Sequence, residues 1–300
     1  MKLIRPINIT DSILVSSNVT EDDFPEWDSS TTYNIGDKVI VISTHRIYES
    51  LTDSNTGNDP TTDDGTNWLN IGATNRYKAF DETISDQVVN TTSITYEFDP
   101  GSLVNAIAMF NLDAADVDIT VTDPEEGVVY EENVSLIDNS AVTNWWGYFF
   151  EPVVRSSEFV RFDLPNYASA TVSVSVNVDI GETAKVGQIV IGNQKSLGLT
   201  TYGTSIGIQD YSTKDNDNFG NAIITERRFA QLVDYDVKLT TGSVRDVQKT
   251  LAGFRATPIV YSGTEDGAYG DLVYGYYRNF GINISGPAFS DATIEVEGLV

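Results

Sequence analysis

The chain has 300 residues, with 18 basic and 44 acidic side chains and a formal net charge of −26, which is length enough for about two domains. It has no cysteine and one histidine, which excludes disulfides, thiolate metal sites and a multi-histidine zinc site. The charge excludes nucleic acid as a ligand, because the phosphate backbone would be repelled.

The N-terminal segment, residues 1–23, is expected to add a strand to a later domain. Its first 17 residues carry polar side chains where a signal peptide has its apolar run. No stretch of the chain approaches the roughly 18 consecutive apolar residues of a membrane span. We therefore expect a protein that is made and assembled in a cytoplasm, without membrane insertion.

Residues 24–72 are rich in Thr, Asp, Asn and Gly and poor in aliphatic side chains. Four aromatic residues are spaced along this block, namely Trp27, Tyr33, Tyr48 and Trp68. Gly36-Asp37 predicts a turn between two short strands. So small a unit has little core, so its aromatic side chains must hold it together.

The order of Trp27, Tyr33, Gly36-Asp37, Tyr48 and Trp68 resembles the small chitin-binding type of carbohydrate-binding module, families 5 and 12. The resemblance implies that some of the four aromatic rings stack on sugar rings, while flanking polar groups bind the hydroxyls. The alternative is a structural module in which the same aromatic residues are simply the core.

His45 lies in a predicted strand of this block. As a catalytic base it would need a nucleophile and an orienting acid. A strand histidine that faces solvent is the favoured interpretation.

Residues 73–192 read as many short strands separated by turns. Residues 117–121 and 171–180 alternate polar and apolar side chains with period two, and Asp99-Pro100-Gly101 marks a turn. The block resembles galactose-binding-like (discoidin-type) jelly rolls in its strand pattern. Its aromatic run at 145–150 is expected to be a packed strand of the jelly roll, with an interface as the alternative.

Residues 193–300 are expected to form an α+β domain with one short helix. Ser243 is the candidate N-cap and Asp246 the capping-box acid, and Gly253 is a stop signal. The last hundred residues hold 8 basic and 13 acidic side chains and include Arg227-Arg228, so they are the least acidic third. We place an assembly surface there, because lower self-repulsion favours docking.

Asp215, Asp217 and Glu226 have the spacing of positions one, three and twelve of an EF-hand calcium loop, with Gly220 at position six. Position five is Phe219, which offers no side-chain oxygen, and the flanking residues are strand-like. An acidic turn is therefore favoured over a metal site, and we expect no cofactor.

The predicted fold is mainly β: a jelly-roll β-sandwich (73–192, joined by 1–23), a small inserted module (24–72) and a C-terminal assembly domain (193–300). This order of blocks resembles bacteriophage tail-tip and baseplate proteins. The resemblance implies a non-enzymatic virion protein that contacts copies of itself and other tail proteins, with host-surface glycan as a further partner of the module. The alternative is a soluble carbohydrate-binding protein or a glycan-degrading enzyme with an attached module.

Overall fold

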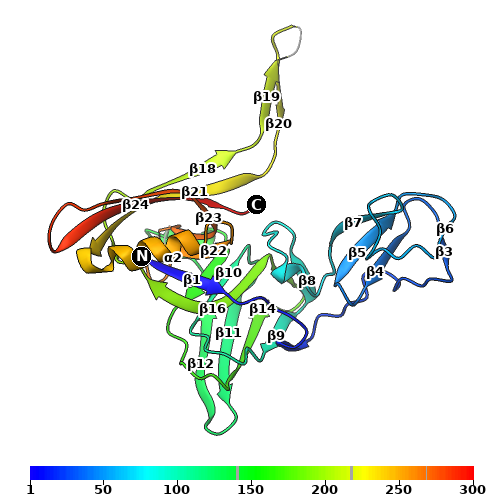
Figure 1. The fold of residues 1–300 in the computed structure, drawn as a ribbon, viewed down its shortest axis with the longest axis horizontal. Helices are drawn as coiled ribbons and strands as arrows, with labels where there is room; N and C mark the ends of the chain where they lie inside the picture. Colours follow the sequence, from blue (N-terminus) through cyan, green and yellow to red (C-terminus); the bar gives the residue numbers. More distant parts are fainter. Residues whose placement is uncertain (140–141, 217–218, 268) are drawn as a thin grey trace.

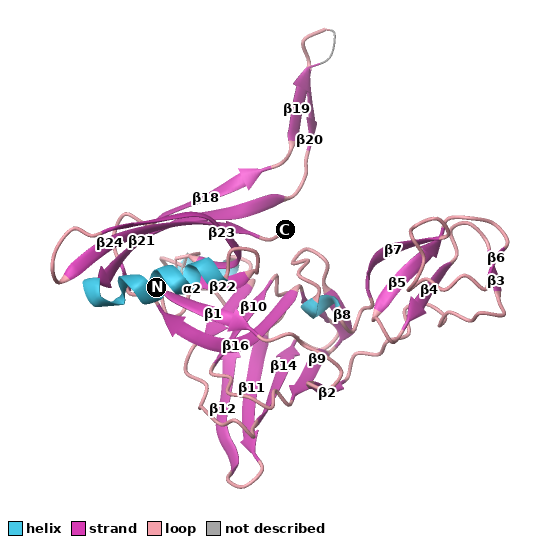
Figure 2. Ribbon diagram, in the orientation of Figure 1, coloured by secondary structure: helices cyan, strands magenta, loops and turns pink. Residues whose placement is uncertain are grey.

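The computed structural model describes residues 1–139, 142–216, 219–267 and 269–300. As predicted, the fold is mainly β, and most strands belong to two antiparallel sheets (Figure 1, Figure 2). A small module lies to one side of this body, and a two-stranded ribbon stands off it elsewhere (Figure 1).

The larger sheet curls and runs through most of the body. Its strands lie in the order β13 (Glu158–Arg161), β10 (Ala106–Phe110), β16 (Gln188–Ser196), β1 (Lys2–Pro6), β22 (Ile259–Ser262), β23 (Leu272–Asn283), β24 (Phe289–Gly298), β21 (Phe229–Thr240) and β17 (Leu199–Thr200). Strand β18 (Ser205–Asp210) also pairs with β21.

The smaller sheet forms the other layer of the sandwich. Its strands lie in the order β12 (Gly127–Ser135), β11 (Asp116–Asp123), β14 (Thr171–Asn177), β9 (Ser93–Phe98) and β2 (Leu14–Ser17). Burial alternates strictly along β11 and β14, as the period-two pattern predicted. Tyr96 and Phe98 of this sheet share one buried core with Ile107 and Met109 of the larger sheet.

Short elements complete the body. A 3-10 helix η1 (Lys78–Phe80) precedes a two-stranded ribbon of β8 (Val88–Thr91) and β15 (Thr183–Val186). The ribbon contributes Val88, Ala184 and Val186 to the sandwich core.

Strand β1 connects the two halves of the larger sheet. It pairs with β16 on one side and with β22 on the other. Strand β16 itself runs across the expected boundary at residue 192, so hydrogen bonding is continuous between the sandwich and the C-terminal strands.

The predicted C-terminal helix is present as α2 (Val244–Gly253), preceded by the 3-10 turn η2 (Thr241–Ser243). Val247 and Leu251 on its inner face are buried against the sheet. Ser243 does not cap the helix: its hydroxyl donates to the Thr240 carbonyl. Asp246 forms an ion pair with Lys195 at 2.8 Å.

The small module contains two short sheets. One pairs β3 (Thr32–Tyr33) with β6 (Asn55–Thr56), and the other consists of β4 (Lys38–Val41), β5 (Arg46–Ser50) and β7 (Trp68–Ala73). Gly36 turns the chain between β3 and β4 with a φ of 87°, a conformation that glycine adopts without strain.

The prediction of a packed strand at 145–150 is wrong. These residues form helix α1 (Trp145–Phe150), and five of its six side chains are exposed. The Asn144 side chain accepts a hydrogen bond from the Gly147 N–H at 2.9 Å, which is the geometry of an N-cap. That local bond starts a helix in a segment whose aromatic residues favour a strand by propensity alone.

Candidate functional site

The four aromatic residues of the module lie together, as its core. Tyr33 and Tyr48 are each 8% exposed and Trp68 is 2% exposed, and Trp27 packs against them half-buried. The rings of Tyr33 and Trp68 meet edge to face at 5.2 Å, and the Trp68 indole N–H donates to the Asn58 carbonyl at 2.9 Å.

Stacking on a sugar needs an exposed ring face, and the protein covers the rings of Tyr33, Tyr48 and Trp68. Of the four candidate binding residues only Trp27 keeps a partly exposed ring. The arrangement matches the structural alternative, in which the aromatic residues are the core. The signal was already in the composition, since a block with few aliphatic residues has little else to bury.

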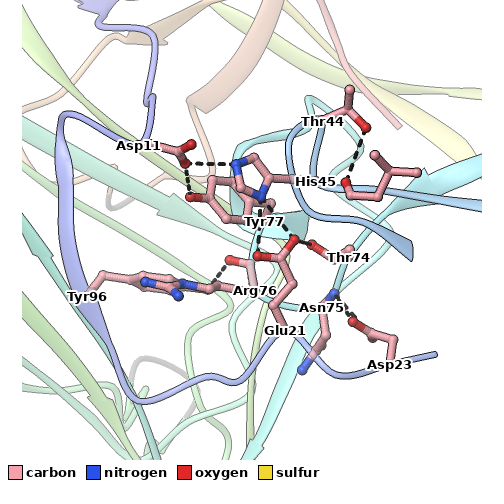
Figure 3. Close-up of polar contacts among 11 residues, drawn as sticks. Asp11, Glu21, Asp23, Thr44, His45, Thr74, Asn75, Arg76, Tyr77 and Tyr96 are labelled. Atoms are coloured by element: carbon pink, nitrogen blue, oxygen red, sulfur yellow. Dashed lines mark hydrogen bonds and ion pairs between the residues drawn. The ribbon is translucent and has the colours of Figure 1, made fainter. Parts of the chain in front are cut away.

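His45 does not lie in a strand, and it does not face solvent freely. It occupies the turn between β4 and β5 with a φ of 53°, and its side chain is 18% exposed. Its Nδ1 lies 2.9 Å from Oε1 of Glu21, and its Nε2 lies 2.7 Å from Oδ1 of Asp11 (Figure 3). The two carboxylates come from the N-terminal segment, far from His45 in sequence.

Tyr77 covers one face of the His45 ring. The two ring centroids are 3.5 Å apart and the planes differ by 12°. The Tyr77 hydroxyl donates to Asp11 at 2.6 Å, and the Thr74 hydroxyl donates to Glu21 at 2.8 Å (Figure 3). The hydrogen bond from Tyr77 lowers the pKa of Asp11, whereas burial and then the bond to Asp11 raise the pKa of Tyr77.

These contacts join three segments: the N-terminal segment, the module turn and the chain that leaves the module. Both ring nitrogens of His45 face carboxylates, and the nearby Thr74 hydroxyl donates to Glu21. In the described part of the chain, no hydroxyl group forms a hydrogen bond with His45 that could make it a nucleophile. The arrangement therefore acts as a clamp between module and body, and we name Asp11, Glu21, His45 and Tyr77 the junction cluster.

The calcium candidates do not form a site in the residues that the structure describes. Asp215 is exposed in β19 (Thr213–Asn216), and Glu226 is exposed just after β20 (Ala222–Thr225). Asp217 lies outside the described residues. No cluster of three or more acidic or histidine side chains suited to a metal ion occurs within the described ranges.

Helix α1 presents an apolar surface that the sequence interpretation placed in the core. Its exposed side chains range from 62% to 78% and belong to Trp145, Trp146, Tyr148, Phe149 and Phe150. Trp146 and Phe150 contact each other at 4.3 Å between ring centroids. A helix that is apolar on all sides is normally covered, so this surface is a candidate for contact with another molecule.

A second apolar surface lies on the projecting ribbon. Strands β18, β19 and β20 together with the start of β21 form this arm, defined here as residues 205–216 and 219–229. Its β19–β20 ribbon stands off the body (Figure 1). Its exposed apolar side chains are Ile206, Ile208, Tyr211, Phe219, Ile223, Ile224 and Phe229. Every residue of β18 and β20 is exposed.

Comparisons with known proteins find little similarity to this chain. No family model matches the sequence, and no curated protein matches it. One similar solved structure is a mutant of the lectin binding domain of Lectinolysin complexed with Lewis b. It is 10% identical, has a TM-score of 0.29, and the match covers 41% of this chain and 84% of that one. A TM-score this low does not establish a common fold. No helix in the described part of the chain is long and apolar enough to cross a membrane.

Proposed function

We propose that the chain is a non-enzymatic structural protein of a bacteriophage tail, in the tail tip, baseplate or fibre-attachment region. The arm is the observation that carries this proposal. A two-stranded ribbon is at best marginally stable in water on its own, and the β19–β20 ribbon of the arm exposes Ile223 and Ile224. Such a ribbon gains stability when a neighbouring protein covers it.

Two cations at the base of the arm support the same role. Arg227 and Arg228 are exposed at its base, and no ion pair of either side chain occurs within the described residues. They stand on a chain whose net charge is −26. Cations that have no ion pair in the described part of the chain and lie next to apolar side chains favour docking onto an acidic surface, such as the rest of a second copy or another tail protein.

In Figure 1 the module lies to the right of the body and the β19–β20 ribbon rises from its top, so the two project in different directions. In an assembly held by the arm, the module would stay free to contact host-surface glycan. That contact is not assigned to Tyr33, Tyr48 or Trp68, because their rings are buried. The family resemblance and the order of the blocks are what support the tail location.

The test is retention in virions. The chain is expected in purified phage particles, where antibodies against it should label the tail in electron micrographs. A variant with Ile223→Asp and Ile224→Asp should fold and yet be absent from particles, because two charges would be buried at the interface.

Ile180→Asp is the matched control, since Ile180 is fully exposed in the turn between β14 and β15 and lies outside the arm. It should enter particles normally. Equal incorporation of the arm variant, or release of sugars from a polysaccharide by the purified chain, would contradict the proposal.

A further inference from the structure

A pocket of about 460 Å³ lies between helix α2 and the two strands β1 and β16. Figure 1 shows α2 beside β1 on one face of the larger sheet. The side chains that matter for its chemistry are Leu3, Arg5, Asn193, Lys195, Lys249 and Phe254.

The strand register explains why these side chains meet. Arg5 pairs with Asn193 and Leu3 pairs with Lys195, and residues opposite each other in an antiparallel pair point to the same face. Leu3 is 1% exposed and shares a core with Val247 of α2, so this is the face that the helix covers. Arg5 and Asn193 lie one pleat further along, next to the helix.

The charge around the pocket is opposite to that of the chain. Lys195 contacts Asp246 at 2.8 Å and donates to the Thr250 hydroxyl at 2.7 Å. Arg5 and Lys249 also line the pocket, and neither has an ion pair among the residues that the structure describes. Three cations thus face one carboxylate, on a chain with a net charge of −26.

The sequence around α2 reinforces this local charge. Residues 247–264 contain no acidic side chain, although the chain as a whole has 44. Arg5 and Lys249 are exposed, so their charges are available to a ligand. Two cations beside a pocket, with no ion pair in the described ranges, concentrate anions from solution.

We propose that this pocket binds an oxyanion, either the carboxylate of an acidic saccharide or a phosphate group. The Arg5 guanidinium can hold two oxygens of one anion, and Lys249 supplies a second positive charge. The Asn193 amide can bind neighbouring hydroxyls, and Phe254 gives the pocket an apolar wall. Pockets of this volume accommodate small ligands. The site is separate from the arm and does not depend on the proposed tail role.

Titration calorimetry on the full chain at low salt tests this. The probes are an oligomer of galacturonic acid, the neutral galactose oligomer of the same length, and inorganic phosphate. We expect the acidic oligomer, phosphate or both to bind, and the neutral oligomer not to bind. Binding of the acidic oligomer alone identifies a saccharide site, and binding of phosphate alone identifies a phosphate site.

The double variant Arg5→Gln, Lys249→Gln should weaken binding at least tenfold. Arg245→Gln is the matched control, because Arg245 lies exposed on the same helix but does not line the pocket. It should change the affinity less than twofold. Absence of binding by both anionic probes, or an equal loss in the control variant, would overturn the proposal. Unchanged thermal unfolding of the double variant shows that it is folded.

Discussion

His45 connects segments that are distant in sequence, through both its ring nitrogens and its ring face. His45→Ala removes the bonds to Asp11 and Glu21 and the stack on Tyr77. We expect the contact between module and body to open more easily, with its free energy of opening lowered by about 1–3 kcal/mol, because two charged groups lose a partner. Hydrogen exchange of amides 74–77 should speed up while the sandwich core stays protected.

His45→Phe separates the two contributions, because it keeps a ring over Tyr77 and loses both nitrogens. Its exchange rates should fall between those of the native chain and His45→Ala. Unchanged exchange at 74–77 in both variants would show that the junction cluster does not hold the module.

Glu158 predicts a pH dependence of stability. Burial, and then the charge of Asp271, raise the pKa of Glu158 from 4.5 to about 7. Between these two values the folded protein holds a proton that the unfolded chain has released, so this group lowers stability as pH rises from 4.5 to 7. The free energy of unfolding that this group removes above pH 7 is on the order of 3 kcal/mol.

Glu158→Gln removes this titration. Relative to the native chain, the variant should be more stable at pH 8 and nearly equal at pH 4, measured by urea unfolding at each pH. A constant difference between the two proteins across that range would contradict the assignment.

At the scale of single residues, the sequence identified the aromatic residues of the module but could not predict whether their rings are buried or exposed. The spacing of Trp27, Tyr33, Tyr48 and Trp68 cannot tell a stacking surface from a core. The role of His45 depends on Asp11 and Glu21, which reach it only because the N-terminal segment runs past the module. Such long-range contacts leave no local signal in a single sequence.

At the scale of elements, the module predicts a contrast between two tryptophans. Trp68→Ala removes a ring that is 2% exposed and bonds to the Asn58 carbonyl, so it should destabilise the module by about 3–5 kcal/mol. Amide exchange in β4, β5 and β7 should become fast, while β11 and β14 remain protected.

Trp145→Ala is the control for that substitution, since Trp145 is 78% exposed on α1. It should change the free energy of unfolding by no more than about 0.5 kcal/mol. A module that stays protected in Trp68→Ala would show that the ring is not needed for folding and would reopen its role in binding.

Strong periodicity explains which elements could be predicted. Strands β11 and β14 alternate over seven or eight residues, and α2 places Val247 and Leu251 on one face. The six residues of α1 are too few and too uniformly aromatic for a period to show. The residues that flank the calcium candidate were expected to be strand-like, and residues 222–225 do form strand β20. Their exposure depends on which layers surround them, and only the three-dimensional fold decides that.

At the scale of the whole molecule, the sequence predicted an N-terminal strand that joins the sandwich, but not that β1 also pairs with the C-terminal strand β22. Five residues at the start of the chain pair with β16, near residue 190, and three of these also pair with β22, near residue 260. The sequence correctly indicated a sandwich and a following α+β block. It could not show that a single sheet passes through both, because pairing partners this far apart are chosen by the packed core.

This topology predicts cooperative unfolding of the body. Ile4 is fully buried and packs in one cluster with Val160 of β13 and with Val260 and Tyr274 of the C-terminal strands. Ile4→Ala should lower the free energy of unfolding by about 2–5 kcal/mol. The sandwich and the C-terminal strands should still unfold together, in one calorimetric transition at a lower temperature.

Val128→Ala is the control, because this side chain on β12 is 59% exposed, and it should leave the temperature of that transition unchanged. Because the module has a separate core, its own unfolding should not move with Ile4→Ala. Two separate body transitions, of which Ile4→Ala shifts only one, would mean that β1 does not couple the two halves of the sheet.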